Sequence, residues 1–230
     1  MSLKSIVSHS YGYVKNKEKF IFREMERKDY DEALKMVSWF WTDAFVHKSM
    51  RVDEKEANIL AKYYVDSYLF NGLSIGVFDK ESGKLICLAM SSIYNFKDKR
   101  VKKVPKEHTF RSLQLATERD YFNSKKDDDG RIFEYIFGLV YPEYGKHNIF
   151  TEVSIMSLDL ARLHGCTEMG GICSSLYTYK ICTKFGHVCG AKIKVSEFVD
   201  PGTGLKLFTD INPKHEYFYW VSLSLKDSKL

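Results

Sequence analysis

The stretch RIFEYIFGLVYPEYGKHNIFTEV, residues 131–153, decides the fold of this chain. Its first part, residues 131–141, is β-rich and has few polar residues inside, which is typical of a central strand buried on both faces. After a turn, apolar residues recur at helical spacing: Ile149, Val153, Met156, Leu160 and Leu163. The pattern predicts a buried strand that leads through a short loop into a helix, which His164 and Gly165 end.

The segments on both sides of this unit predict a mixed sheet with helices on both faces. Asp29 and Asp53 each precede a glutamate by three residues, which is typical of a helix start. The other predicted elements are, in order, a strand (20–25), two helices from these aspartates, a hairpin (73–94), a helix (107–122), a strand (166–174), a helix (175–185) and strands at 191–199, 205–211 and 215–225.

Length and composition exclude several classes of protein. With 230 residues and a hydrophobic fraction of 44%, the chain can bury a full core, and we expect one domain at residues 20–230 after an N-terminal extension at residues 1–19. The net charge of +5 comes from Lys and Arg that are spread along the chain, so nucleic-acid binding is not indicated. No apolar run is long enough for a signal peptide or a membrane span, so we expect a cytoplasmic protein that contacts no membrane.

The cysteine pattern argues against a metal site or a disulfide framework. The five cysteines are odd in number and include no C-x-x-C pair. We therefore expect most of the cysteines to be reduced thiols in the core, and no bound metal.

Several motifs between residues 132 and 220 resemble the GNAT superfamily of acetyl-CoA-dependent N-acetyltransferases, and within it the arylalkylamine and polyamine acetyltransferase-like proteins of invertebrates. The motifs are the strand end LVYPEY, the loop GKHNIFTEV, the helix SSLYTYKICTKFGH, and the downstream PGTGLKLF and PKHEYFYW. The resemblance implies an α/β (α+β mixed) GNAT fold with a central mixed seven-stranded sheet. It also implies direct acetyl transfer from acetyl-CoA to an amine in a ternary complex.

Such a reaction needs an anion site for the pyrophosphate of acetyl-CoA. The resemblance places this site in the loop before the 149–163 helix, because free N–H groups and the helix dipole favour an anion there. The family pattern there is Gln or Arg, two residues, Gly, one residue, and Gly or Ala. Those places hold Gly145, Asn148 and Phe150. Asn148 can take glycine-like backbone angles, whereas Phe150 would crowd the phosphate, and Lys146 and His147 could supply charge. The alternative is a plain strand-to-helix turn.

The resemblance also implies where the rest of the cofactor binds. The backbone at the end of the buried strand would pair with the pantetheine arm and supply donors for the oxyanion. Tyr177 would pack nearby. The predicted cofactor-binding residues are Leu139, Val140, Tyr141, Gly145, Lys146, His147, Asn148, Ile149, Phe150, Thr151 and Tyr177.

Candidates for proton transfer come from the same resemblance. Cys182 stands where many members have a tyrosine general acid, although a buried core thiol is the favoured alternative. Ser174 and Thr178 match serines implicated in the arylalkylamine branch, and for Ser174 we favour a helix N-cap role instead. Asp43 in FWTDAFV and Glu134 on the central strand are the candidate bases, with ordinary polar roles as the favoured alternative.

We expect the acceptor to be a small primary amine, held by aromatic faces and carboxylates. The candidate wall lies in the two early helices and comprises Trp39, Trp41, Phe45, Tyr63 and Tyr64, each of which is individually more typical of a core. The tail histidine His215 is expected to be structural. The rival function is a GNAT-fold binding or sensor module without efficient catalysis, and we expect a monomer or homodimer.

Overall fold

The computed structural model describes residues 3–9, 11–44, 48–49, 52–97, 110–125, 128–206, 208 and 211–226. Its helices are α1 (Leu3–Ser8), α2 (Tyr30–Asp43), α3 (Glu54–Tyr68), α4 (Phe110–Ser124), α5 (Ile149–Leu163) and α6 (Leu176–Lys184). Its strands are β1 (Phe20–Glu24), β2 (Ile75–Asp79), β3 (Leu85–Asn95), β4 (Arg131–Val140), β5 (Glu168–Cys173), β6 (Val188–Lys194) and β7 (Tyr217–Ser224). Phe45 lies outside the described residues.

The described strands form one sheet of seven, in the order β1-β2-β3-β4-β5-β7-β6. Only β4 and β5 pair in parallel, and the other neighbours are antiparallel. α5 is the crossover between β4 and β5, as a parallel pair requires. The prediction of a mixed seven-stranded sheet flanked by helices is confirmed.

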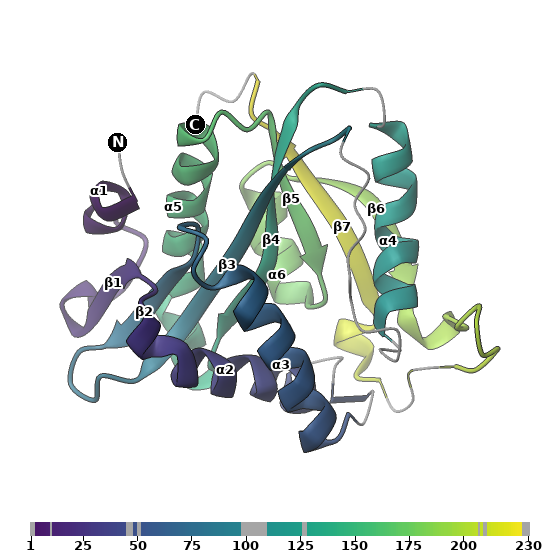
Figure 1. Cartoon of the computed structure of the whole chain (residues 1–230), viewed down its shortest axis with the longest axis horizontal. Coiled ribbons are helices and arrows are strands. Elements are labelled where there is room, and N and C mark those ends of the chain that lie inside the picture. The colour runs from purple at the N-terminus through teal and green to yellow at the C-terminus, as the bar shows by residue number, and fades with distance from the viewer. Residues whose placement is uncertain are drawn as a thin grey trace.

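The helices form a layer on each face of this sheet (Figure 1). Successive residues of β7 show the division, because Trp220 packs with Tyr121 of α4 and Val221 packs with Cys182 of α6. α2 and α3 share a core cluster with Phe218 of β7, on the same face as α4. α1 and α5 share a second cluster, centred on residues such as Phe133 of β4, on the opposite face with α6.

β4 and β5 separate soon after they meet. They pair only from Ile132 to Tyr135 on β4 and from Glu168 to Gly171 on β5. The pairing of β4 with β3 shifts at the same level, because Met90 faces Phe137 while Ser91 faces Tyr135, which leaves Ile136 as an extra residue. Such a bulge bends a strand and increases its twist, so β4 turns away from β5 and opens the sheet at this point.

Several predicted boundaries differ from the structure. Residues 205–211 do not form the predicted strand where they are described, because the pairing there is a single bridge between Val199 and Lys206. β6 begins at Val188, earlier than residue 191, and α1 was not predicted. α1 buries Leu3, Ile6 and Val7, so the segment before β1 packs onto the rest of the molecule.

Asp29 was expected to cap α2, but its side chain makes no cap hydrogen bond there. It accepts two hydrogen bonds from the guanidinium of Arg23, at 2.6 and 2.7 Å, and one from the backbone N–H of Glu26 at 2.8 Å. Burial alone would raise the pKa of this carboxyl, but the bonds from Arg23 and Glu26 outweigh burial and lower the pKa. Asp29 therefore joins β1 to the start of α2.

We expect Asp29→Asn to lower the free energy of unfolding by about 1–2 kcal/mol at neutral pH, because a neutral amide replaces a charged acceptor. A carboxyl whose pKa is lowered by folding stabilises the protein above its unfolded pKa of about 3.9, and this contribution disappears as the pH falls. Urea unfolding at pH 7 and at pH 3 tests this, with Asp31→Asn, at an exposed position, as the control. If Asp29→Asn lowered the free energy of unfolding by the same amount at pH 7 and at pH 3, the prediction would be wrong.

Candidate functional site

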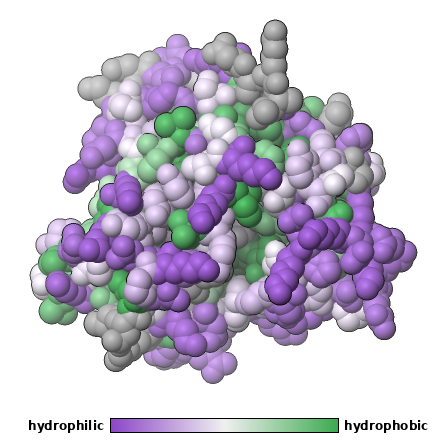
Figure 2. Space-filling model, turned by 180° about the vertical axis from the view of Figure 1, so that it is seen from behind, coloured by the Kyte–Doolittle hydropathy of each residue, from purple (hydrophilic) through white to green (hydrophobic). Residues whose placement is uncertain are grey.

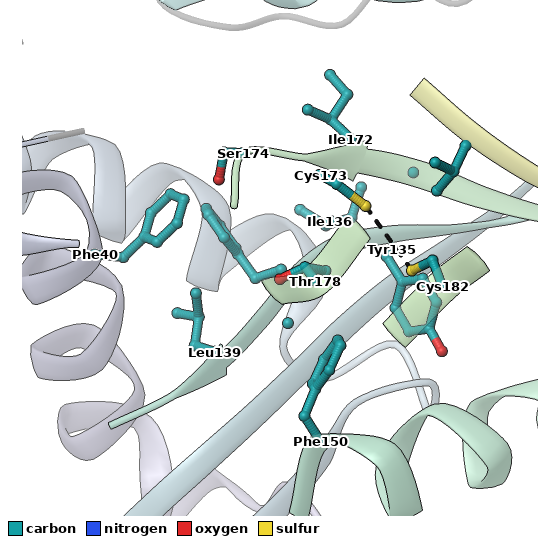
Figure 3. A pocket seen from close by; sticks show the side chains of 14 residues that line it. Phe40, Tyr135, Ile136, Leu139, Phe150, Ile172, Cys173, Ser174, Thr178 and Cys182 are labelled. Carbon is teal, nitrogen blue, oxygen red and sulfur yellow. Dashed lines mark hydrogen bonds between the residues drawn. The ribbon is translucent and has the colours of Figure 1, made fainter. Parts of the chain in front are cut away.

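A narrow cleft lies where β4 and β5 separate. It runs between the two helix layers, from Phe40 of α2 on one face to Phe150 of α5 on the other (Figure 3). The free volume is about 60 Å³. The described residues that line it carry no charge, and they are Phe40, Tyr135, Ile136, Phe137, Gly138, Leu139, Phe150, Gly171, Ile172, Cys173, Ser174, Thr178, Cys182 and Val221.

β4 presents an unpaired backbone edge to this cleft. The N–H of Tyr141 donates to the carbonyl oxygen of Ile86 on β3. Since backbone groups alternate along an antiparallel strand, the N–H and C=O groups of Gly138 and Val140 point the other way, toward β5. β5 does not pair with this part of β4, so these groups can meet a ligand in the cleft. Among the predicted backbone donors, the N–H of Val140 faces the cleft and is available to the cofactor arm. The N–H of Tyr141 is not available, because it donates to Ile86 of β3.

The loop from β4 to α5 is a 3-10 turn, Pro142–His147, followed by Asn148. Asn148 has φ 59° and ψ 22°, the left-handed conformation that glycine adopts most easily. Its side-chain amide donates to the carbonyl oxygen of Tyr13. The expectation that Asn148 takes glycine-like angles is confirmed.

The two basic residues of the loop differ in position. The His147 ring packs edge-on against Phe20 of β1, with ring centroids 5.3 Å apart, and its backbone carbonyl accepts from the N–H of Lys15. The ring therefore lies toward β1. Lys146 and Gly145 are exposed, so Lys146 can reach an anion beside the loop.

Phe150, in the first turn of α5, places its ring on the backbone of Gly138. A Cβ atom on Gly138 would lie 2.4 Å from Cε2 of Phe150, so the ring fills the space that a side chain would otherwise take. Figure 3 shows the ring in the cleft, on the side away from Phe40. Ile149 is buried in the core, and Thr151 is half-buried.

The cleft and the loop fit the two ends of acetyl-CoA unequally. The β4 edge and the apolar walls suit an acylated arm that carries amide groups. The loop keeps the N–H groups of a helix start, but the Phe150 ring occupies the back of the cleft. A free volume of about 60 Å³ is well below the ~300 Å³ at which small-molecule pockets usually begin. An arm can therefore enter fully only if the Phe150 ring moves.

α6 contributes hydroxyl and thiol groups to the cleft. The N-cap of α6 is Ser175, whose hydroxyl accepts from the N–H of Tyr177 at 3.1 Å, so the N-cap role favoured for Ser174 is wrong. Ser174 and Thr178 line the cleft instead. Figure 3 labels both among the side chains that line the pocket.

Cys173 and Cys182 form a buried pair at the same cleft, with the thiol of Cys173 directed at the sulfur of Cys182 over 3.8 Å. The hydrogen bond to Cys182 and burial raise the pKa of the Cys173 thiol well above its ordinary value. All five cysteines are free thiols, and all except Cys189 are buried. Among the described residues, no group of three or more His, Cys, Asp or Glu side chains is placed to hold a metal ion.

The two candidate bases lie outside the cleft lining. Asp43 is exposed at the end of α2 and accepts a hydrogen bond from the hydroxyl of Thr42 at 2.6 Å. Glu134 is 2% exposed and stands beside Ser92 of β3 and Gly170 of β5. It therefore projects from the α4 face of the sheet. The structure does not bring these carboxylates together with Thr178 or Cys182.

The aromatic residues of α2 and α3 divide into core and wall. Trp41 and Tyr64 are buried in the main core. Trp39 is half-buried, and its ring lies 5.0 Å from that of Tyr141, while Phe40 lines the cleft and packs at 5.1 Å against Phe137. Tyr63 is half-buried against Tyr64. Of these residues of α2 and α3 only Phe40, which was not among the candidates, lines the cleft, and Trp39 packs beside it on Tyr141.

His215 contacts the start of α6. Its Nδ1 accepts from the N–H of Leu176 at 3.2 Å, so this nitrogen carries no proton. Burial and the charge of Lys214 lower the pKa of His215, which keeps the ring neutral. Tyr177 is exposed, with Lys214 over its ring at 4.4 Å. Tyr177 therefore lies outside the cleft.

A segment before β1 braces α5, and no sequence motif indicated it. The carboxylate of Glu152, which is fully buried, accepts from the N–H groups of Tyr11 and Tyr13, both at 2.9 Å. The Tyr13 ring also meets Phe185, which follows α6, in an edge-to-face contact. We call residues 11–17 the N-terminal strap.

Figure 2 shows the face that carries α5 and α6, with apolar surface in a central hollow bordered by hydrophilic residues.

Comparisons with solved structures agree with the fold described above. The structure is similar to arylalkylamine N-acetyltransferase 2 of Aedes aegypti, with a TM-score of 0.72 and 17% identity over 89% of this chain and 98% of that chain. It is also similar to the polyamine N-acetyltransferase of Drosophila melanogaster, with a TM-score of 0.70 and 12% identity over 90% of this chain and 100% of that chain. The chain has the GNAT fold.

A third similar structure is the C-terminal condensation domain of Ebony, solved in complex with beta-alanyl-dopamine. Its TM-score is 0.72 and its identity 14%, over 90% of this chain and 99% of that chain. No protein-family model matches the sequence, and no curated protein matches it. In the described part of the chain, no helix has the length and apolar character needed to cross a membrane.

Proposed function

We propose that this protein is an N-acetyltransferase that transfers an acetyl group from acetyl-CoA directly to a small primary amine, either an arylalkylamine or a polyamine. The observation that carries the proposal is the unpaired edge of β4 at Gly138 and Val140, which faces Thr178 across an apolar cleft. The enzymes whose structures this chain resembles are named for these two amine classes.

The groups of the cleft have separate tasks in this reaction. The N–H of Val140 or Gly138 stabilises the negative charge that develops on the thioester oxygen when the amine attacks. The hydroxyl of Thr178, with Ser174 on the same cleft, relays the proton that the attacking amine loses to the departing thiolate, so that the hydroxyl itself is left unchanged. Phe40, Trp39 and Tyr141 offer aromatic faces to the substrate amine. Burial and low polarity strengthen each of these contacts.

We expect Thr178→Val to lower kcat by about tenfold or more, because it removes the hydroxyl that protonates the leaving thiolate and keeps the shape of the side chain. A thiol-release assay with acetyl-CoA, run across aromatic amines and polyamines, measures this. Thr183→Val on the exposed side of α6 is the matched control. A Thr178→Val enzyme with unchanged kcat would remove Thr178 from proton transfer.

The second candidate function is a GNAT-fold binding or sensor module with weak or no catalysis. One observation favours this second function. None of the described residues that line the cleft has a carboxylate that could act as the general base. A binding module shows ligand-dependent thermal stabilisation without thiol release for any amine. The cytoplasmic location and the monomeric or homodimeric state remain predictions.

A further inference from the structure

We propose that Cys173 and Cys182 form a dithiol that hydrogen peroxide oxidises to a disulfide, which joins the end of β5 to α6 at the cleft. The oxidation of the pair does not depend on the proposed function. Its effect on the rate of acetyl transfer rests on that function.

The position of the two sulfur atoms is the first support. They lie 3.8 Å apart, with the S–H of Cys173 directed at the sulfur of Cys182 (Figure 3). A disulfide bond is about 2.05 Å long, so an approach of less than about 2 Å completes it. Both residues line the cleft, and among the described lining residues they carry the only thiols.

The backbone around each cysteine keeps the two thiols side by side. Cys173 pairs with Tyr219 of β7. The carbonyl oxygen of Cys182 accepts from the N–H groups of Phe185 and His187, at 3.0 and 3.1 Å. It also accepts from Nδ1–H of His187 at 3.0 Å. The thiols cannot separate far without breaking these contacts, so each has a high effective concentration at the other.

The neighbouring Cys189 is placed differently. Its thiol donates to the carbonyl oxygen of Ala191 at 3.3 Å, and the residue is half-buried. It does not belong to the described lining of the cleft. Cys189 is therefore a matched control for the pair.

Hydrogen peroxide can reach the pair through the cleft. The free volume of about 60 Å³ exceeds the about 10–15 Å³ that a water molecule needs, and peroxide has one oxygen more than water. The thiolate of one cysteine attacks a peroxide oxygen, the O–O bond breaks, hydroxide leaves and a sulfenic acid forms. The second thiol attacks that sulfur, the S–S bond forms and water leaves. The two thiols thus lose two electrons and two protons, and peroxide becomes two water molecules.

The disulfide acts on the cleft through α6. Thr178 precedes Cys182 by four residues on this helix, so the two side chains share one helix face. A pull on Cys182 toward β5 shifts Thr178 relative to the β4 edge, and a misplacement of about 1 Å can slow an enzyme about 100-fold. We expect the oxidised protein to transfer acetyl groups at least about tenfold more slowly, and dithiothreitol to restore the rate.

Peptide mapping of the full chain after treatment with hydrogen peroxide tests the pairing. We expect one cross-link, between the peptides that hold Cys173 and Cys182. N-ethylmaleimide in denaturant should then label two cysteines fewer than the five of the reduced protein. Cys189→Ala should form the same cross-link, and Cys182→Ala should form none. If Cys182→Ala does not fold, the wild-type map decides. A wild-type protein that keeps five labelled thiols, or that links another pair, would overturn the inference.

The rate of acetyl transfer, measured as acetylated amine after the peroxide has been removed, separates this inference from the proposed function. A slower oxidised enzyme that dithiothreitol restores supports both. A cross-link with an unchanged rate would overturn the effect on α6 and leave the acetyltransferase proposal intact. A cross-link in a protein that acetylates no amine in either state would sink the proposed function and leave the disulfide assignment in place.

Discussion

Glu152→Ala is expected to lower the free energy of unfolding by about 3 kcal/mol, which is a large share of the stability of a domain. The substitution leaves the N–H groups of Tyr11 and Tyr13 without their acceptor and removes the carboxylate 3.9 Å from the ammonium of Lys17. It also empties a fully buried position in the first turn of α5. The strap should then detach from α5 while the sheet remains folded.

Two measurements check this. Urea unfolding gives the free energy, and limited proteolysis shows whether cleavage within residues 11–17 accelerates. Glu143→Ala removes an exposed carboxylate from the neighbouring loop and should change neither measurement. Glu152→Gln keeps one acceptor oxygen, so its free energy of unfolding should fall less than that of Glu152→Ala. An unchanged urea midpoint and cleavage rate in Glu152→Ala would show that the strap is held by its apolar contacts alone.

Acid is expected to destabilise the protein through His187. Burial lowers the pKa of His187 to about 4, although its contact with the carbonyl of Cys182 opposes this shift. The unfolded chain takes up a proton near pH 6.5 and the folded chain only near pH 4, so stability is fully present above pH 6.5 and falls below it. The free energy of unfolding should fall by about 3 kcal/mol between pH 6.5 and pH 4, because each pH unit of difference between the two pKa values contributes about 1.36 kcal/mol.

His187→Asn tests the assignment, because an asparagine amide can replace the ring Nδ1–H that donates to Cys182 at 3.0 Å but does not titrate. The variant should lose most of the slope between pH 6.5 and pH 4 in urea-unfolding experiments. His164→Asn, at an exposed position after α5, is the control and should keep the slope. A wild-type protein whose stability is flat across this range would contradict the prediction.

The elements that follow from strong local patterns could be predicted from the sequence. The apolar stripe from Ile149 gave α5 with its end at His164, because a helix face repeats at a fixed period. Asp53 caps α3 as expected and accepts from the N–H of Glu56. Asn148 adopts the backbone angles of the glycine it replaces. In each case the information lies within a few residues of the sequence.

The remaining features depend on contacts that only the folded structure shows. Asp29 has the spacing of a helix cap, but the nearby Arg23 is a stronger partner than the helix N–H groups. Ser174 and Ser175 are equivalent in sequence, and the structure makes Ser175 the cap, because its hydroxyl accepts from the N–H of Tyr177. The role of Glu152 depends on a segment about 140 residues upstream. Phe150 was expected to crowd a phosphate, but its contact with Gly138 required the fold.

The strap also has a consequence for how the chain folds during synthesis. Tyr11 and Tyr13 are separated from Glu152 by 141 and 139 residues, so their partners do not exist until α5 has been made. Contacts of such long range form slowly, and segments that wait for them expose apolar surface. Leu3, Ile6 and Val7 of α1, which are buried in the folded protein, cannot reach their contacts with α5 until that helix has been made. The strap and α1 thus dock only after α5 has been translated.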